Sequence, residues 1–125
     1  MNELTPQYFK QKHHKFVFFQ AFFIKNHTMT RAEFDNCLTS GTFPKGNNIL
    51  LEALFHDAHD DWKAAHDIAQ SREGTLLYDR LHAYLHRKEG DDWNANYWYR
   101  RAKTTMPNVS FSEEWDNLVM LFLPS

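Results

Sequence analysis

Apolar residues recur along this chain three or four positions apart, the spacing of an amphipathic helix. In residues 5–26, four phenylalanines from Phe9 to Phe23 fall on one side of such a helix, and a Thr-Pro pair supplies its cap and first turn. The apolar run 16–24 is too short to cross ~30 Å of hydrocarbon and has no signal-peptide cleavage site after it. We therefore predict a long, buried N-terminal helix and no membrane span.

A second helix is predicted by a capping box. Thr30 precedes Glu33 by three positions, so a short helix should run from about residue 31 to residue 39 and end before Gly41. The Pro-, Gly- and Asn-containing stretch 41–48 then reads as a loop. It separates an N-terminal helical hairpin from the rest of the chain.

The middle of the sequence repeats itself. Residues 51–65 align with residues 82–96, 31 positions later, and share a Leu, an Asp-Asp-Trp string and an Ala. Each copy predicts a helix, a tight turn at the acidic pair and a second helix. The pairs Asp60-Asp61 and Asp91-Asp92 are interpreted as caps of the second helices.

Near the C-terminus, Ser110 and the two glutamates that follow it predict the start of a last helix. The sequence thus predicts an all-α protein of tetratricopeptide-like antiparallel helix pairs, in one domain spanning residues 1–125. Its parts are an aromatic helical hairpin at 1–47, two helix pairs at 48–107 and a capping helix at 108–125. The 11 Phe, 5 Tyr and 4 Trp predict an unusually aromatic core.

Charge and cysteine content narrow the classes of partner and compartment. The formal net charge of −2 provides no basic field for nucleic acid or an anionic membrane surface. Cys37 is the single cysteine, which excludes an intramolecular disulfide and favours a cytoplasmic location. We therefore expect a soluble cytoplasmic protein that does not bind nucleic acid.

The second copy resembles a known repeat family. A helix ending at a Gly-Asp pair is followed by small and aromatic residues, as in the second half of a tetratricopeptide repeat. The resemblance covers about residues 48–107 and implies stacked antiparallel helices, although the period is shorter than the family's usual 34 or so. The matching residues are Gly90, Asp91, Asn94, Ala95, Tyr97, Tyr99, Ala102 and Pro107.

A narrower resemblance attaches to residues 82–102, HAYLHRKEGDDWNANYWYRRA. This string is similar to a family of small uncharacterised microbial proteins that carries the pattern H-A-x-x-H-R-x-E-G-D…N-A-x-Y-W-Y-x-R. In that family the first copy reads H-D…A-H-x-x-x-Q, matched here by His56-Asp57, Ala65-His66 and Gln70. The resemblance implies no particular activity.

Histidines are the residues in the repeats most suggestive of a site. His82 and His86 lie four positions apart on one helical face and align with the apolar Leu51 and Phe55, so they are expected to point inward. A buried imidazole is costly without a partner, which suggests acceptors, a ligand or a metal ion. With a second pair from the first copy, the candidate metal ligands are His56, His59, His82 and His86.

A wider set of polar and aromatic residues around these histidines could form a ligand pocket, although each could equally serve the fold. No catalytic residue is assigned, since the sequence has no phosphate-binding glycine loop, no serine nucleophile motif and no Cys-His pair. The candidate ligand-binding residues are His56, Asp57, His66, His82, His86, Arg87, Glu89, Asp91, Asn94, Tyr97, Trp98 and Arg101.

Two functions remain open from the sequence. The favoured one is a non-enzymatic binding or scaffold module for a peptide, a protein partner or a small ligand, working without a cofactor. The alternative is a metal-dependent enzyme or ligand sensor that uses the His, Asp, Arg and Glu cluster. The wide phenylalanine surface of the first helix also suggests a homodimer.

Overall fold

The computed structural model describes residues 27–124, and all regular structure in that range is helical. The predicted all-α class is therefore confirmed for this part of the chain. The predicted helix at 5–26, and the dimer contact expected of it, lie outside the described residues. The helices are α2 (Arg31–Ser40), α3 (Ile49–Ala58), α4 (Trp62–Gln70), α5 (Leu76–Lys88), α6 (Asp92–Arg101) and α7 (Phe111–Phe122).

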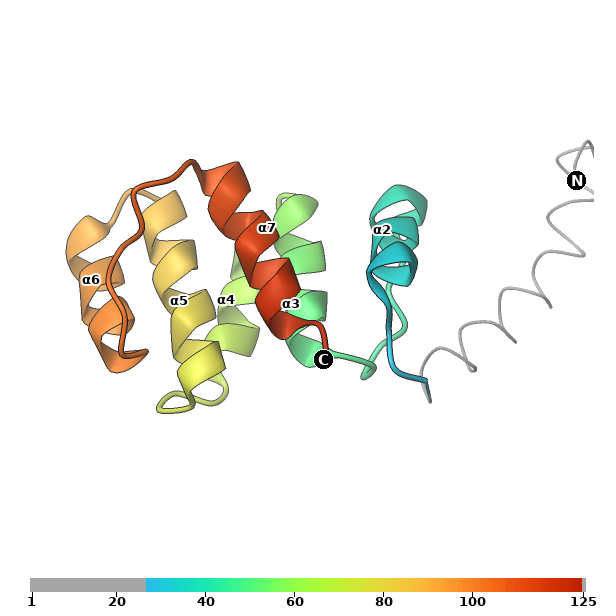
Figure 1. The fold of residues 1–125 in the computed structure, drawn as a ribbon, viewed down its shortest axis with the longest axis horizontal. Coiled ribbons are helices and arrows are strands. Elements are labelled where there is room, and N and C mark those ends of the chain that lie inside the picture. Colours follow the sequence, from blue (N-terminus) through green and yellow to red (C-terminus); the bar gives the residue numbers. More distant parts are fainter. Residues whose placement is uncertain (1–26, 125) are drawn as a thin grey trace, which may run out of the picture.

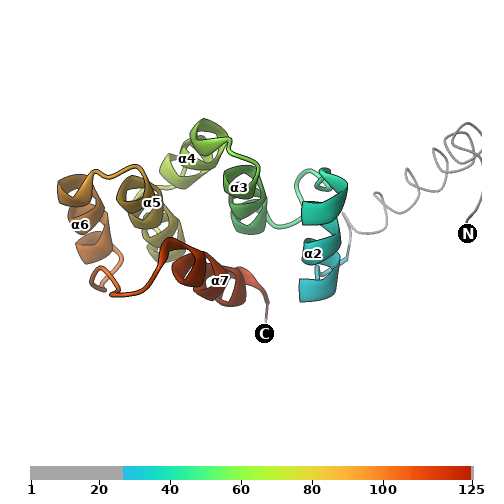
Figure 2. The ribbon, with the colours of Figure 1, turned by 90° about the horizontal axis from the view of Figure 1, so that it is seen from above.

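Helices α3 to α6 form two antiparallel pairs that stack side by side (Figure 1). Within the stack α3 packs on α4, α4 on α5 and α5 on α6, while α2 touches the end of the stack at α3. Helix α7 returns from the far end and lies across α3 and α5, on the side of these helices away from α4 (Figure 2). One face of the stack is thus occupied by the chain's own last helix.

The helix starts follow the capping signals of the sequence. The Thr30 side chain accepts a hydrogen bond from the Glu33 amide, and the Glu33 carboxylate accepts one from the Thr30 amide, so the predicted capping box is confirmed. Asp61 and Asp91 cap α4 and α6, so the caps predicted at the acidic pairs are confirmed for one member of each pair. Ser110 caps α7 by accepting from the Glu113 amide at 3.0 Å.

The turns inside the two helix pairs show that the copies match at a spacing of 30, one less than the alignment predicts. The Asp61 amide donates to the His56 carbonyl at 2.9 Å, and the Asp91 amide donates to the His86 carbonyl at 2.9 Å. Asp60 has a φ of 62°, where the second copy has Gly90 at 91°. Aspartate tolerates this left-handed conformation, so Asp60 takes the place of the turn glycine.

This spacing of 30 corrects the sequence alignment from which His82 and His86 were expected to point inward. The structural counterparts of His82 and His86 are Glu52 and His56, not the apolar Leu51 and Phe55. His82 and His86 are nevertheless buried, with 2% and 7% of their surface exposed.

The two aligned tryptophans also differ in position. Trp62 is the first residue of α4 and is partly buried, and its indole N–H donates to the Leu85 carbonyl at 2.8 Å. Trp93 is 82% exposed on α6, because it lies one position further into its helix.

The core is aromatic and continuous from α2 to α5 and α7. Phe34 of α2 stacks on Trp115 of α7 at 5.9 Å, which ties the first described helix to the last. Leu54 and Leu85 are fully buried at the centre, and each such side chain stabilises the fold by about 2 kcal/mol. A smaller cluster that includes Trp98 joins α5 to α6.

Two buried carboxylates fix the neighbouring helices. Glu114 of α7, 1% exposed, accepts from Arg87 at 2.7 Å and from the Tyr99 hydroxyl at 2.5 Å. Asp57 of α3, 3% exposed, accepts from the Tyr84 hydroxyl at 2.8 Å and from Lys88 at 2.9 Å. Because each carboxylate has a cationic partner and a hydroxyl donor, its burial is compensated.

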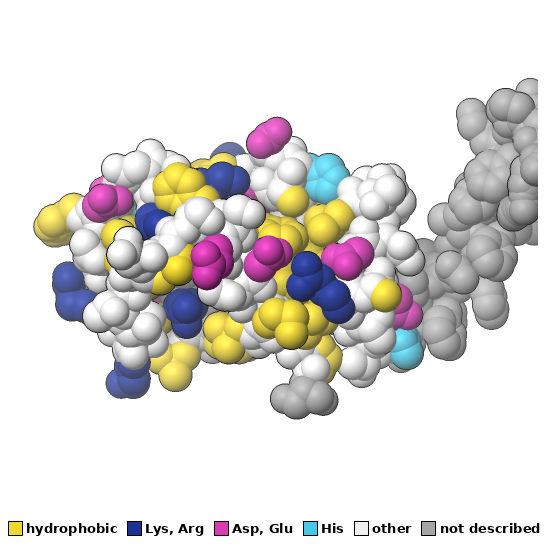
Figure 3. Space-filling view, turned by 45° about the horizontal axis from the view of Figure 1, so that its top comes forward, with side chains coloured by type: hydrophobic (Ala, Val, Ile, Leu, Met, Phe, Trp, Pro, Cys, Tyr) yellow, Lys and Arg dark blue, Asp and Glu magenta, His cyan; other side chains and the backbone are white. Residues whose placement is uncertain are grey.

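The described surface is mixed in character. Figure 3 shows apolar side chains at separate places between acidic and basic ones on the face drawn. Among residues 27–124, no helix is long and apolar enough to span a bilayer.

Candidate functional site

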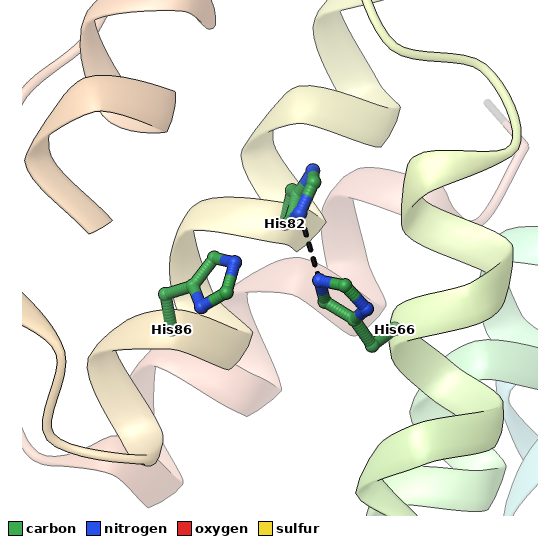
Figure 4. Close-up of side chains that lie close together, drawn as sticks. All are labelled: His66, His82 and His86. Atoms are coloured by element: carbon green, nitrogen blue, oxygen red, sulfur yellow. Dashed lines mark hydrogen bonds between the residues drawn. The ribbon is translucent and has the colours of Figure 1, made fainter. Parts of the chain in front are cut away.

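Three histidines meet at the seam between the two helix pairs. His82 and His86 come from successive turns of α5, and His66 comes from α4, which packs against it. Figure 4 shows the three rings turned toward one another. One nitrogen of each ring lies within 4.8 Å of the other two, and the His66 and His82 Nε2 atoms are 2.9 Å apart.

Two tryptophans hold this three-histidine cluster in place. The Trp62 indole stacks on His66 with ring centroids 4.6 Å apart, and Trp98 of α6 stacks on His82 at 4.0 Å. Trp62 also meets the edge of His86 at 5.8 Å. Because Trp62 is itself hydrogen-bonded to the α5 backbone, the rings have little freedom to turn away from one another.

Burial and mutual proximity lower the pKa of two of the rings and so favour their neutral forms. Burial, followed by the neighbouring His66 and His86, lowers the pKa of His82 to about 3 from its ordinary 6.5. Burial and then His86 also lower the pKa of His66, against the opposing effect of nearby carboxylates. A neutral imidazole has one nitrogen lone pair free to accept a hydrogen bond or bind a metal ion.

His82 is incompletely satisfied. Its Nε2 meets only another histidine, and its Nδ1 is buried without a hydrogen-bond partner. Only two other buried side-chain atoms in residues 27–124 share this condition, Glu52 Oε1 and Arg80 Nε. Leaving a buried polar group unpaired costs about 1–3 kcal/mol, which a leucine at this position would avoid.

One edge of the cluster is acidic. The Glu89 carboxylate lies 2.7 Å from His86 Nδ1, and the Asp91 carboxylate lies within 4.8 Å of both. Asp67, Glu89 and Glu73 are the carboxylates that act on the His66 ring, where they raise its pKa. These carboxylates are exposed, and they place negative charge near the cluster.

Two other first-copy histidines, His56 and His59, lie elsewhere. His56 Nε2 is 3.5 Å from the Glu52 carboxylate, one turn back on α3. The two ring nitrogens of His59 contact the carbonyls of Phe55 and Leu38 at 2.8 and 3.2 Å. Neither histidine joins the three-histidine cluster. The structure therefore does not bring His56 and His59 together with His82 and His86, as the sequence had suggested.

Two further candidates, Asp57 and Arg87, belong to the buried networks that hold the helices. Arg87 donates to Glu114 and to the Val109 carbonyl, and its guanidinium lies 4.7 Å from the Phe111 ring. Asp57 lines an open hollow of about 340 Å³ between α3, α5 and α7. Its carboxylate accepts hydrogen bonds from Tyr84 and Lys88. Burial raises the pKa of Tyr84, and the Asp57 carboxylate raises it further.

The candidates on α6 divide between the cluster and the surface. Trp98 reaches the cluster, whereas Asn94 bonds to the Asp91 cap at the start of the helix. Tyr97 and Arg101 pair on the exposed side at 3.4 Å, and Arg101 also lies 4.0 Å from Asp79.

Two residues that hold the cluster and the neighbouring helices were not identified by the sequence analysis. Trp62 entered it only as part of the Asp-Asp-Trp match, although its spacing of four from His66 places both on one face of α4. Glu114 was expected only as part of the acidic start of the last helix, and it is buried. Glu114 precedes the apolar Leu118 by four positions and Phe122 by eight, which places it on the buried face of α7, and the exposed Glu113 lacks this spacing.

The cluster combines three features of a ligand-binding site. It offers imidazole lone pairs in a partly buried position, aromatic walls and an acidic edge, a combination suited to a small electrophilic or cationic ligand.

The chain matches no known family model, no curated protein and no solved structure.

Proposed function

We propose that the protein is a non-enzymatic binding module, built as a tetratricopeptide-like stack of helix pairs, and that it holds a small ligand at His66, His82 and His86. The observation that supports this most is His82, which is 2% exposed and has one ring nitrogen without a partner. Such an arrangement lowers stability and is expected where function, rather than the fold, keeps a histidine at a buried position.

Binding is favoured over catalysis by the neighbours of the three rings. Trp62 and Trp98 stack on them, and Glu89 accepts from His86, so these contacts hold and orient the rings. They include no serine, threonine or cysteine that could attack a substrate. A peptide groove is disfavoured on the α7 side, where α7 already lies on α3 and α5.

The test is to replace His82 by leucine and measure both stability and binding. The His82→Leu protein should melt at the same temperature as the natural protein or higher, because an unpaired polar group has been removed. Thermal shifts produced by a panel of divalent metal salts, inorganic phosphate, small carboxylates and nucleotides should disappear. A His59→Gln control, altered outside the cluster, should keep them.

Two results would contradict the proposal. A fall of many degrees in the melting temperature of His82→Leu would show that the histidine serves the fold. Equal thermal shifts in His82→Leu and the natural protein would place binding elsewhere.

A second candidate function, capture of a protein partner, is supported by Trp93. Within the stack the side of α4 that carries Trp62 is covered by α5, whereas Trp93 of α6 is 82% exposed. Exposed tryptophans are enriched among residues that dominate binding energy. A photo-crosslinking residue at position 93 should form a discrete adduct in cells, and the same residue in place of the exposed Lys63 should form none.

A further inference from the structure

We propose that the ligand of the three-histidine cluster is a divalent transition-metal ion, bound by one ring nitrogen each from His66, His82 and His86. This inference rests on the proposed binding function and names its ligand. Metal–nitrogen bonds of about 2.0–2.1 Å in a tetrahedral site place the nitrogens about 3.3 Å apart. The observed 2.9 Å between two of them, with all three within 4.8 Å, requires only small rotations of the rings.

The hydrogen bonds already present suit such a site. The 2.9 Å contact between the Nε2 atoms of His66 and His82 contains one hydrogen, which a metal ion bound to both nitrogens would displace. The ring that carried this proton on Nε2 then carries it on Nδ1, so both rings stay neutral. His86 donates through Nδ1 to Glu89 at 2.7 Å, which leaves its Nε2 lone pair available. Metal-binding histidines very often donate their other N–H to a carboxylate in this way. Glu89 is therefore a positioning residue for His86.

The donor set selects a class of metal. Three imidazoles suit Zn²⁺, Co²⁺, Ni²⁺ and Cu²⁺, whereas Ca²⁺ and Mg²⁺ prefer oxygen ligands. The thiol of Cys37 lies apart, buried in the core on α2, and its pKa is raised by burial and then by Glu33. Three protein ligands leave a fourth position for water or an outside donor.

The surrounding charge favours a cation. Asp67, Glu73 and Glu89 are exposed and lie near enough to raise the pKa of His66, and their negative charge attracts a divalent cation. An ion bound here would also link α4 to α5 and thereby join the two helix pairs at their seam.

The test uses the full chain without a histidine tag, treated with chelator and then titrated with Zn²⁺ by calorimetry. We expect one equivalent to bind and the melting temperature to rise. His66→Gln should weaken binding at least tenfold, and it is a mild change because His66 is half-buried. His59→Gln, a matched histidine outside the cluster, should bind as the natural protein does.

Two further measurements bear on geometry and orientation. Co²⁺ bound to the natural protein should give the intense visible absorption of a four-coordinate site, which does not depend on any variant folding. Glu89→Gln should weaken Zn²⁺ binding by about 10- to 100-fold through the loss of the carboxylate that orients His86, with little change in melting temperature.

The possible failures can be told apart. Absence of Zn²⁺ and Co²⁺ binding, or equal affinity in His66→Gln and His59→Gln, overturns the metal assignment. If another class of compound then gives a thermal shift that depends on His82, the binding module stands with a different ligand. A His82→Leu protein that melts far lower and leaves every thermal shift unchanged overturns the binding module as well.

Discussion

Replacing His82 should change how the stability of the metal-free protein depends on pH. In the folded chain the pKa of His82 is about 3, and in the unfolded chain it should return to about its ordinary 6.5. Below that ordinary value the unfolded chain binds a proton that the folded chain does not. The His82 contribution therefore lowers stability progressively as the pH falls from 6.5 toward 3.

The size of this effect follows from the pKa difference. Each unit of pH below the unfolded pKa costs about 1.4 kcal/mol, so the loss between pH 7 and pH 5 is about 2 kcal/mol. A leucine does not titrate, so the free energy of unfolding of His82→Leu should gain about 2 kcal/mol relative to the natural protein over this interval. The gain adds to any difference already present at pH 7.

Urea unfolding followed by far-ultraviolet circular dichroism, at both pH values and with chelator present, measures this difference. His82→Gln is the control, since glutamine keeps a polar group but has no proton to gain. Both variants should show the same dependence on pH although their absolute stabilities differ. A difference from the natural protein that stays constant within about 0.5 kcal/mol would refute the claim that His82 is buried and neutral.

Three further predictions concern the scaffold. Glu114→Gln should lower the free energy of unfolding by about 3 kcal/mol in urea, because Arg87 loses the carboxylate that compensates its charge; a loss below about 1 kcal/mol would count against that role. Gly90→Ala should cost about 1 kcal/mol by the same assay, since φ is +91° and no atom lies near an added Cβ; an unchanged stability would argue against the left-handed turn. Trp93→Ala should leave the melting temperature nearly unchanged, in contrast to Trp62→Ala, which should lower it by several degrees.

The sequence was sufficient for the helices of the described region and for several of their starts. Caps act within one turn, so Thr30, Asp61 and Ser110 could be recognised from their neighbours alone. The tight turns at the acidic pairs were equally local. The alignment of the two copies was nevertheless wrong by one position, because it matched the shared Asp-Asp-Trp strings. The turn geometry instead makes Asp60 equivalent to Gly90.

The site could be predicted only in part. The spacing of His82 and His86 places them on one face of a helix, and that is a property of the sequence. Which third histidine joins them depends on how α4 packs against α5, and packing selects His66 over His56 and His59. Tertiary contacts also decided that Glu114 is buried and that Trp93 is exposed, since each depends on which distant helix covers a given face.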